Sequence, residues 1–344
     1  MKLKKLALTI FAVLIVLLLL VAYNFYTKIY APNVTEDTAV YIPTDASFDK
    51  VKDALKPYID NTSSFQWVAE KKNYPNVIKP GKYLIKKGMS NNELIDLLRS
   101  GKQTPVMVTF NNQDTLEKLS ERLAEQLEPD SLQLLNTFLD TDFLQKNNLS
   151  KKSVLGIFIP NTYELYWNAS AKKLRDRMLH EYNTFWNKSR INKAKELGLT
   201  KQEVITLASI VQKETSRPIE RPSVAGLYLN RLRSNWALQA DPTIIYALKQ
   251  KYGEDYEVKR VLNKDLTIAS PYNTYIHTGL PPSLIAMPDI SSIDAVLNPK
   301  NHDYYYMCAS VTNIGYHEFA RTLAQHNKNA AKYQQWISKQ GINR

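Results

Sequence analysis

An uncharged run near the N-terminus restricts this chain more than any other feature. Residues 6–22 read LALTIFAVLIVLLLLVA and carry no ionisable side chain. As a helix, this run extends about 26 Å at 1.5 Å per residue, which nearly crosses the hydrocarbon core of a bilayer. Tyr23, Phe25 and Tyr26 continue it with aromatic residues, which are typical of the membrane interface. We expect residues 1–30 to form a cytoplasmic tip and a transmembrane anchor.

Basic residues on one side of the run indicate its orientation. Lys2, Lys4 and Lys5 precede it, and the positive-inside rule then leaves the N-terminus in the cytoplasm. The expected location is the inner (cytoplasmic) membrane, crossed once, with the bulk of the chain in the periplasm or another extracytoplasmic space. A cleaved signal peptide is the alternative, but the run is long and no A-x-A site follows it.

The net charge of +12 suits an acidic partner: nucleic acid, anionic lipid or an anionic cell-wall polymer. Export argues against nucleic acid, and general solubility is the plainer explanation of the charge. The single cysteine, Cys308, cannot form an intrachain disulfide, and we expect it to be a buried, inert strand residue. The histidines show no metal-ligand spacing, so we predict neither a metal nor a cofactor.

The predicted fold class is α+β, with a small module ahead of a larger domain. A short linker at 31–37 is expected to open the module, which spans 31–105. Within it, Ser90 with Glu93 predicts a capping box, and Gly101 predicts the end of the same helix. The strand, turn and helix resemble a LysM-like module of the kind that binds glycan chains. A small packing domain without a ligand is the alternative.

The rest of the chain divides into two segments with different residue patterns. Residues 106–150 predict a strand and two amphipathic helices, which we interpret as a spacer or lid segment without chemistry of its own. Residues 151–344 are the expected catalytic domain, a larger α+β unit. It contains a long irregular loop, SPYNTYIHTGLPPSLIAMP, and loops of this kind carry function when a rigid scaffold holds them.

One glutamate in this domain continues an apolar stripe. TKQE at 200–203 predicts a capping box that begins a helix. Glu214 lies four residues after Ile210 and three after Val211, on the face those residues bury. Burial and the negative end of the helix dipole both raise the pKa of a carboxyl, which can then act as a general acid. Alternatively, Glu214 leans outward and pairs with Arg217 or Arg221.

A second carboxylate, Asp241, stands before Pro242 in the string ALQADPT. Aspartate is a favoured helix N-cap and proline a favoured first helical residue, so the pair predicts a helix start. Capping explains Asp241 without chemistry. A catalytic role is the other possibility.

The ordered strings ASIVQKE, LYLNRLR, LQADPT, YNTY, GLPP, HEFA and HN resemble the MltG/YceG family of membrane-anchored endolytic murein transglycosylases. The resemblance covers the anchor, the small module and 154–333. It implies cleavage of the β-1,4 MurNAc–GlcNAc bond in nascent peptidoglycan strands, which leaves a 1,6-anhydro-MurNAc end and terminates glycan elongation. The single catalytic glutamate of the family matches Glu214. The matching cleft residues are Asn230, Arg231, Gln239, Asp241, Tyr272, Asn273, Tyr275 and His317.

The implied partners are peptidoglycan glycan strands and, through cleavage of nascent chains, penicillin-binding proteins. Leu155 and Asn161 stand where the family has a glutamate and an aspartate, so no second carboxylate is expected there. A different class of function stays open: a non-catalytic, membrane-anchored peptidoglycan-binding scaffold of the cell-wall synthesis machinery. New chain ends in digested glycan would distinguish the two.

Overall fold

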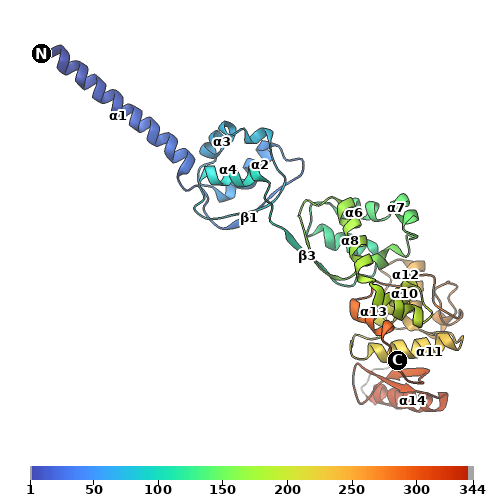
Figure 1. Ribbon diagram of the computed structural model, residues 1–344. Coiled ribbons are helices and arrows are strands. Elements are labelled where there is room, and N and C mark those ends of the chain that lie inside the picture. The colour runs from blue at the N-terminus through green and yellow to red at the C-terminus, as the bar shows by residue number, and fades with distance from the viewer. Residues whose placement is uncertain (1, 340–344) are drawn as a thin grey trace. The chain divides into compact units, whose positions relative to one another are not determined.

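The computed structural model describes residues 2–339 and divides into two compact units (Figure 1). Unit 1 comprises Met1–Val108, Glu125–Pro129 and Tyr163–Ser170, and unit 2 comprises Thr109–Ala124, Asp130–Thr162 and Ala171–Arg344. Each mixes helices with short two-stranded sheets, which agrees with the expected combination of helix and sheet.

Unit 1 begins with α1 (Lys2–Tyr30), a helix long and apolar enough to cross a membrane. None of its residues is buried, but Ile29 in its last turn packs against the core of unit 1. A single-pass anchor is compatible with this helix.

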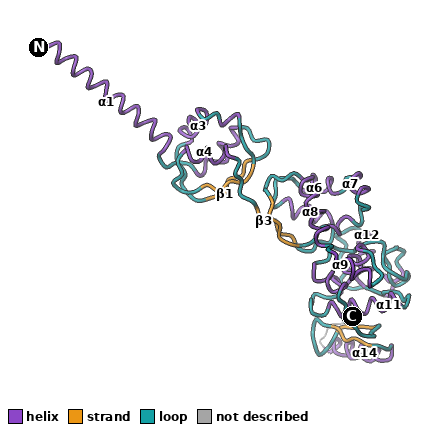
Figure 2. The backbone as a smooth tube through the Cα atoms, viewed as in Figure 1, coloured by secondary structure: helices purple, strands orange, loops and turns teal. Residues whose placement is uncertain are grey.

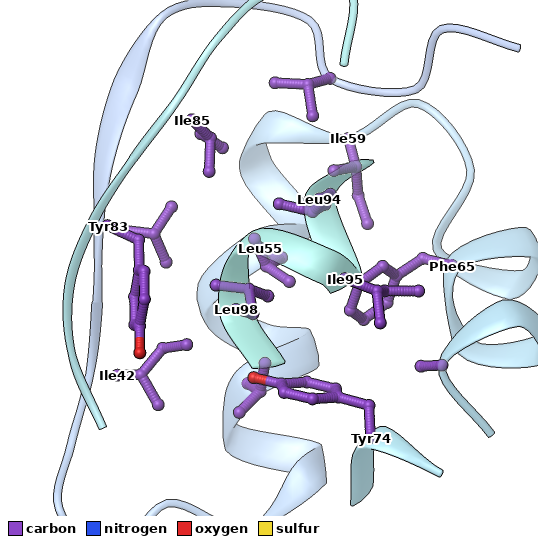
Figure 3. Close-up of a cluster of buried hydrophobic side chains, with 14 of the residues drawn as sticks. Ile42, Leu55, Ile59, Phe65, Tyr74, Tyr83, Ile85, Leu94, Ile95 and Leu98 are labelled. Atoms are coloured by element: carbon purple, nitrogen blue, oxygen red, sulfur yellow. The ribbon is translucent and has the colours of Figure 1, made fainter. Parts of the chain in front are cut away.

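The core of unit 1 lies between one two-stranded antiparallel sheet and three helices (Figure 3). Strands β1 (Thr38–Ile42) and β2 (Gly81–Ile85) pair antiparallel, and alternate residues of each point inward. The helices are α2 (Phe48–Leu55), α3 (Thr62–Lys71) and α4 (Asn91–Ser100), with short 3-10 turns at Lys56–Tyr58 and Tyr74–Asn76. Each contributes large apolar side chains that are fully buried, among them Leu55, Phe65 and Leu94.

The predicted boundaries of α4 are confirmed. Ser90 and Glu93 form the reciprocal capping box, and Gly101 ends the helix at φ +69°, a left-handed conformation that favours glycine.

The linker expected at 31–37 is an ordered part of unit 1 instead. Asn33 and Val34 are 4% and 3% exposed, and both backbone N–H groups donate to Met89 O. The local sequence is polar, but its partners lie far along the chain, around residues 58–61 and 88–91, so local composition does not reveal them.

Strands β3 (Val106–Phe110) and β4 (Asn161–Leu165) form the next two-stranded sheet, where the chain passes from one unit to the other. The two predicted amphipathic helices are α5 (Leu116–Ala124) and α6 (Ser131–Phe138), and a further short helix, α7 (Thr141–Lys146), follows them. The helix α8 (Ala171–Phe185) packs on α6, and a 3-10 turn lies at Val154–Ile157.

The helix α10 (Lys201–Glu214) is the centre of unit 2. It begins at the predicted Thr200–Glu203 capping box, and every residue from Val204 to Val211 is buried. Because it is buried on all sides over this stretch, it has packing neighbours all round. They include α11 (Arg221–Arg233), α12 (Asp241–Tyr252) and α13 (Ile290–Leu297), with α9 (Lys188–Glu196) packed more lightly.

A hairpin and a final helix complete unit 2. Strands β5 (Tyr306–Ala309) and β6 (His317–Ala320) pair antiparallel with Tyr306 opposite Ala320, and α14 (Leu323–Lys339) packs on both. The irregular loop between α12 and α13, which contains one 3-10 turn at Asn263–Thr267, is drawn as teal tube in Figure 2.

Candidate active site

Glu214 is the last residue of α10, and its side chain turns toward α11. The Tyr228 hydroxyl of α11 donates a hydrogen bond of 2.5 Å to Glu214 Oε1. Neither arginine that could have drawn Glu214 outward contacts it. Arg217 lies over the ring of Tyr316, 5.5 Å from its centroid, and Arg221 pairs with Asp289 at 2.7 Å. The inward orientation expected from the spacing of the apolar stripe is the one found.

Burial raises the pKa of Glu214 to about 7. The Tyr228 hydrogen bond and the nearby His317 and Arg231 side chains lower this pKa, while Asp241 raises it, but loss of solvent is the largest cause. Glu214 nevertheless stays half-buried, so part of its carboxyl remains reachable. At neutral pH a carboxyl of this kind is present in both protonation states, which suits a group that gives and then takes a proton.

A cavity of about 200 Å³ opens onto this carboxyl. Its walls come from α10, α11, the start of α12, the loop before α13, and the β5–β6 hairpin. The lining residues are Glu214, Leu227, Tyr228, Arg231, Gln239, Asp241, Tyr275, Met307, Cys308, Ala309 and His317. Five of the eight predicted cleft residues therefore meet beside Glu214.

Arg231 forms part of the cavity wall through a fixed side chain. Its Nε donates to Tyr305 O at 2.7 Å and its Nη1 to Leu238 O, and the guanidinium lies near the ring of Trp236. These bonds hold the cation in place while it is almost fully buried. It thus supplies positive charge to the cavity without an ion pair of its own among the described residues.

Gln239 reaches the cavity through an unusual backbone. Its φ of +51° is left-handed, which costs a non-glycine residue roughly 1 kcal/mol, and its N–H donates to Thr274 O at 2.9 Å. The side chain is exposed and lines the cavity.

Asp241 does not cap α12, contrary to the expectation from the Asp-Pro pair. The N-cap is Ala240, which has no side-chain bond, and Asp241 is the first helical residue. Its Oδ1 instead accepts a hydrogen bond of 2.6 Å from the Tyr275 hydroxyl. Burial and this aspartate raise the pKa of Tyr275, so the phenol stays a donor. A role as helix N-cap therefore does not explain why an aspartate stands at position 241.

Three predicted cleft residues lie outside the cavity lining and hold the scaffold. Asn230 Nδ2 donates to the carbonyls of His302 and Tyr304. Asn273 is fully buried and donates to Leu266 O and Ile268 O. The Tyr272 hydroxyl shares a hydrogen bond of 2.7 Å with Ser283 Oγ inside the core.

His317 is held by a buried carboxylate that the sequence did not single out. Glu220, 6% exposed, accepts from the His317 backbone N–H at 2.6 Å and lies 2.9 Å from its Nδ1. With Nδ1 carrying the proton toward Glu220, the Nε2 edge of the ring is left for the cavity.

Sequence reasoning also missed Tyr228 as a residue of the site. A buried tyrosine needs a partner for its hydroxyl, and that requirement was the available signal. Cys308 lies in strand β5, as expected, but it is half-buried and lines the cavity, so the expectation that it is buried is wrong. Burial and Glu318 raise the pKa of its thiol, which keeps it protonated. Among residues 2–339 no group of three or more His, Cys, Asp or Glu side chains could hold a metal ion.

Comparison with known proteins gives a consistent result. The profile of the YceG-like family matches residues 40–332. The chain is 30% identical to the endolytic murein transglycosylase of Bacillus subtilis (strain 168) over 317 residues, which cover 86% of this chain and 84% of that protein. It is 28% identical to a protein of the same name from Streptococcus pneumoniae serotype 2, and there it spans only 53% of the relative's length. Among solved structures, a YceG-like protein from Listeria monocytogenes is 26% identical with a TM-score of 0.56, over 85% of this chain and 98% of that one.

Proposed function

The chain belongs to the YceG-like family, and from this premise we propose that it is an endolytic lytic transglycosylase that cuts peptidoglycan strands with Glu214 as its single acid and base. The observation that carries the proposal is the state of Glu214: a half-buried carboxyl with a pKa of about 7 beside a polar cavity. The names of the curated relatives supply the reaction class and the substrate.

The reaction needs one group that first donates a proton and later accepts one. Protonated Glu214 gives its proton to the oxygen of the β-1,4 bond between MurNAc and GlcNAc, and the bond from that oxygen to the anomeric carbon breaks. The C6 hydroxyl of the same MurNAc attacks the anomeric carbon and returns its proton to Glu214. The products are a 1,6-anhydro-MurNAc end and a free 4-hydroxyl, and the acid is regenerated. No water is consumed.

The neighbours of Glu214 suit this cycle. Tyr228 donates to the carboxylate and so steadies the form left after the first proton transfer. Arg231, Gln239 and His317 line the cavity and can stabilise charge that develops on the sugar oxygens. The pair of Asp241 and Tyr275 offers a hydroxyl and a carboxylate for sugar hydroxyl groups.

Asp241 also defines the closest chemical alternative. Hydrolysis needs a second carboxylate to activate water, and Asp241 is the other carboxylate in the cavity lining. A hydrolase would leave reducing MurNAc ends, whereas the proposed transglycosylase leaves anhydro ends. The two products differ in mass by one water.

The test is digestion of purified sacculi followed by mass spectrometry of the released glycan. The parent chain should yield internal cuts with 1,6-anhydro ends, and Glu214→Gln should yield none while still binding glycan. Glu196→Gln is the matched control, because Glu196 also ends a helix but is exposed to solvent. Parental activity in Glu214→Gln would refute the assignment, and no new ends from the parent would favour the non-catalytic scaffold.

The setting of the reaction is a further part of the proposal. With α1 as an uncleaved anchor and Lys2, Lys4 and Lys5 in the cytoplasm, the chain that follows α1 stands outside the inner membrane, where nascent strands emerge. The LysM-like reading of unit 1 assigns it to glycan binding. Cutting nascent strands implies work beside penicillin-binding proteins, and crosslinking in intact cells would identify them.

A further inference from the structure

The end of α1 is fixed to unit 1 by a buried polar network. Asn91 of α4 donates from Nδ2 to Lys28 O and to Ser64 Oγ, each at 2.9 Å. Its Oδ1 accepts from Asn33 Nδ2 at 2.6 Å, and both asparagines are almost fully buried. Breaking such a network leaves buried amide groups without partners, which is costly because they have lost their hydrogen bonds to water. The rest of unit 1 is therefore rigidly attached to the helix that enters the membrane.

A tryptophan of unit 1 lies against the same end of α1. The rings of Trp67 in α3 and Phe25 in α1 are stacked, with centroids 5.3 Å apart and planes 28° apart. Two ammonium groups face this indole: Lys28 Nζ at 5.6 Å and Lys71 Nζ at 5.9 Å from the ring centroid. Neither lysine has a carboxylate partner among residues 2–339.

Counting along α1 gives the depth of this cluster. A hydrocarbon core of about 30 Å takes roughly 20 residues at 1.5 Å each. Starting from Leu6, the apolar core ends close to Phe25. Trp67, stacked on Phe25, then lies at the boundary of the hydrocarbon, and Lys28 lies one turn further out, among the lipid headgroups.

We propose that Phe25, Lys28, Trp67 and Lys71 form a membrane seat that binds anionic phospholipid headgroups. These lipids belong to the leaflet through which the C-terminal end of α1 exits the membrane. Indole rings favour this interface, and each lysine near an anionic leaflet adds to the attraction. The unpaired lysines beside the indole supply the charge for a lipid phosphate. The seat rests on the proposed anchor, and it holds unit 1 down on the bilayer rather than free above it.

The test uses the full chain in nanodiscs that contain brominated phospholipid, because bromine quenches nearby indoles. Bromine at acyl positions 6 and 7 should quench Trp67, and Trp67→Phe should remove at least half of the total quenching. Trp167→Phe is the matched control, since Trp167 belongs to the same unit but packs on Tyr41 of β1. Equal quenching in the parent and in Trp67→Phe overturns the seat. A chain that stays outside the discs refutes the anchor instead.

The choice of lipid is tested in the same discs. At equal mole fraction, brominated phosphatidylglycerol should quench Trp67 at least twofold more than brominated phosphatidylcholine. The double variant Lys28→Gln, Lys71→Gln should abolish that preference and keep the quenching by phosphatidylcholine. No preference in the parent chain refutes recognition of anionic headgroups. Cleavage of sacculi is unaffected in every case, which separates this proposal from the catalytic one.

Discussion

Tyr228, in the middle of α11, donates to Oε1 of Glu214, the last residue of α10, across 2.5 Å. The bond opposes burial: burial favours the protonated carboxyl, whereas a donor at 2.5 Å favours the carboxylate. The balance between them places the pKa of Glu214 at about 7. Changes to either partner should therefore be visible as pH dependence.

Tyr228→Phe should move the alkaline limb of the activity profile upward. The ring is kept and only the hydroxyl is lost, so the carboxylate loses a donor and the pKa of Glu214 rises further above its usual range. A shift of about 0.5–1 pH unit in the limb of kcat is expected, since one such hydrogen bond contributes roughly 1 kcal/mol. The measurement is the initial rate of anhydro-end formation between pH 5 and pH 9. An unmoved limb would show that Tyr228 does not tune Glu214.

Glu214→Gln should stabilise the protein at alkaline pH. The folded pKa of about 7 lies above the ordinary glutamate value of 4.5, so between these two values the folded state holds more protons and its stability falls as pH rises. Below pH 4.5 the residue makes no difference, and above pH 7 the full penalty of roughly 3 kcal/mol applies. The amide carries no such penalty. We expect a higher urea midpoint for the variant at pH 8 and equal midpoints near pH 4, and the reverse order would contradict a raised pKa.

Glu220→Gln tests how His317 is held. Glu220 is 6% exposed and lies 2.9 Å from His317 Nδ1, so it fixes which ring nitrogen carries the proton. The amide can still accept the backbone N–H but no longer favours one tautomer of the ring. A loss of kcat of about tenfold with little change in KM is expected, typical of a positioning residue.

A spectroscopic readout separates this role from a purely structural one. Nitrogen NMR of labelled histidine should show His317 protonated at Nδ1 in the parent chain and as a mixture of tautomers in Glu220→Gln. Asp289→Asn is the control, because Asp289 pairs with Arg221, the residue next to Glu220, without contacting His317. Parental kcat together with an unchanged tautomer would exclude a positioning role.

Some predicted cleft residues line the cavity and others hold the scaffold. Comparing the stability and the activity of variants tests this division. Gln239→Asn introduces a residue type that tolerates the left-handed backbone of this position and shortens the side chain that lines the cavity. It should lower kcat/KM about tenfold at unchanged stability. Asn273→Ala should instead destabilise by about 2–3 kcal/mol, because two buried carbonyls lose their donor. Equal losses of stability in both variants would refute the division.

Whether a feature could be predicted from the sequence depends on how far apart along the chain the interacting residues lie. The capping boxes at Ser90 and Thr200 and the inward face of Glu214 depend on residues within one or two turns, and all three were predicted correctly. Asp241 was misassigned because Asp-Pro fits a helix start equally well with aspartate inside the helix. Its partner, Tyr275, lies 34 residues further on.

Long-range contacts also decided which polar residues reach the cavity. Asn230 and Arg231 are adjacent in α11, yet the first donates to the carbonyls of His302 and Tyr304 and the second lines the cavity. The rotation of α11 that separates them is set by tertiary packing, which spacing along one helix does not reveal. The same holds for Asn33, whose partner Asn91 lies 58 residues away.

Cys308 provides a chemical probe of the cavity, because it is the chain's one cysteine and lies in the cavity lining. Burial and Glu318 raise the pKa of its thiol, so labelling by a maleimide should be slow at pH 7 and accelerate as pH rises through 9. A bulky maleimide occupies a large part of a cavity of about 200 Å³, and labelled protein should lose at least nine-tenths of its activity. Cys308→Ala should stay active and be insensitive to the reagent, since the thiol itself carries no step of the proposed reaction. Full activity after stoichiometric labelling would mean that glycan is cut elsewhere, and it would refute the site together with the role of Glu214.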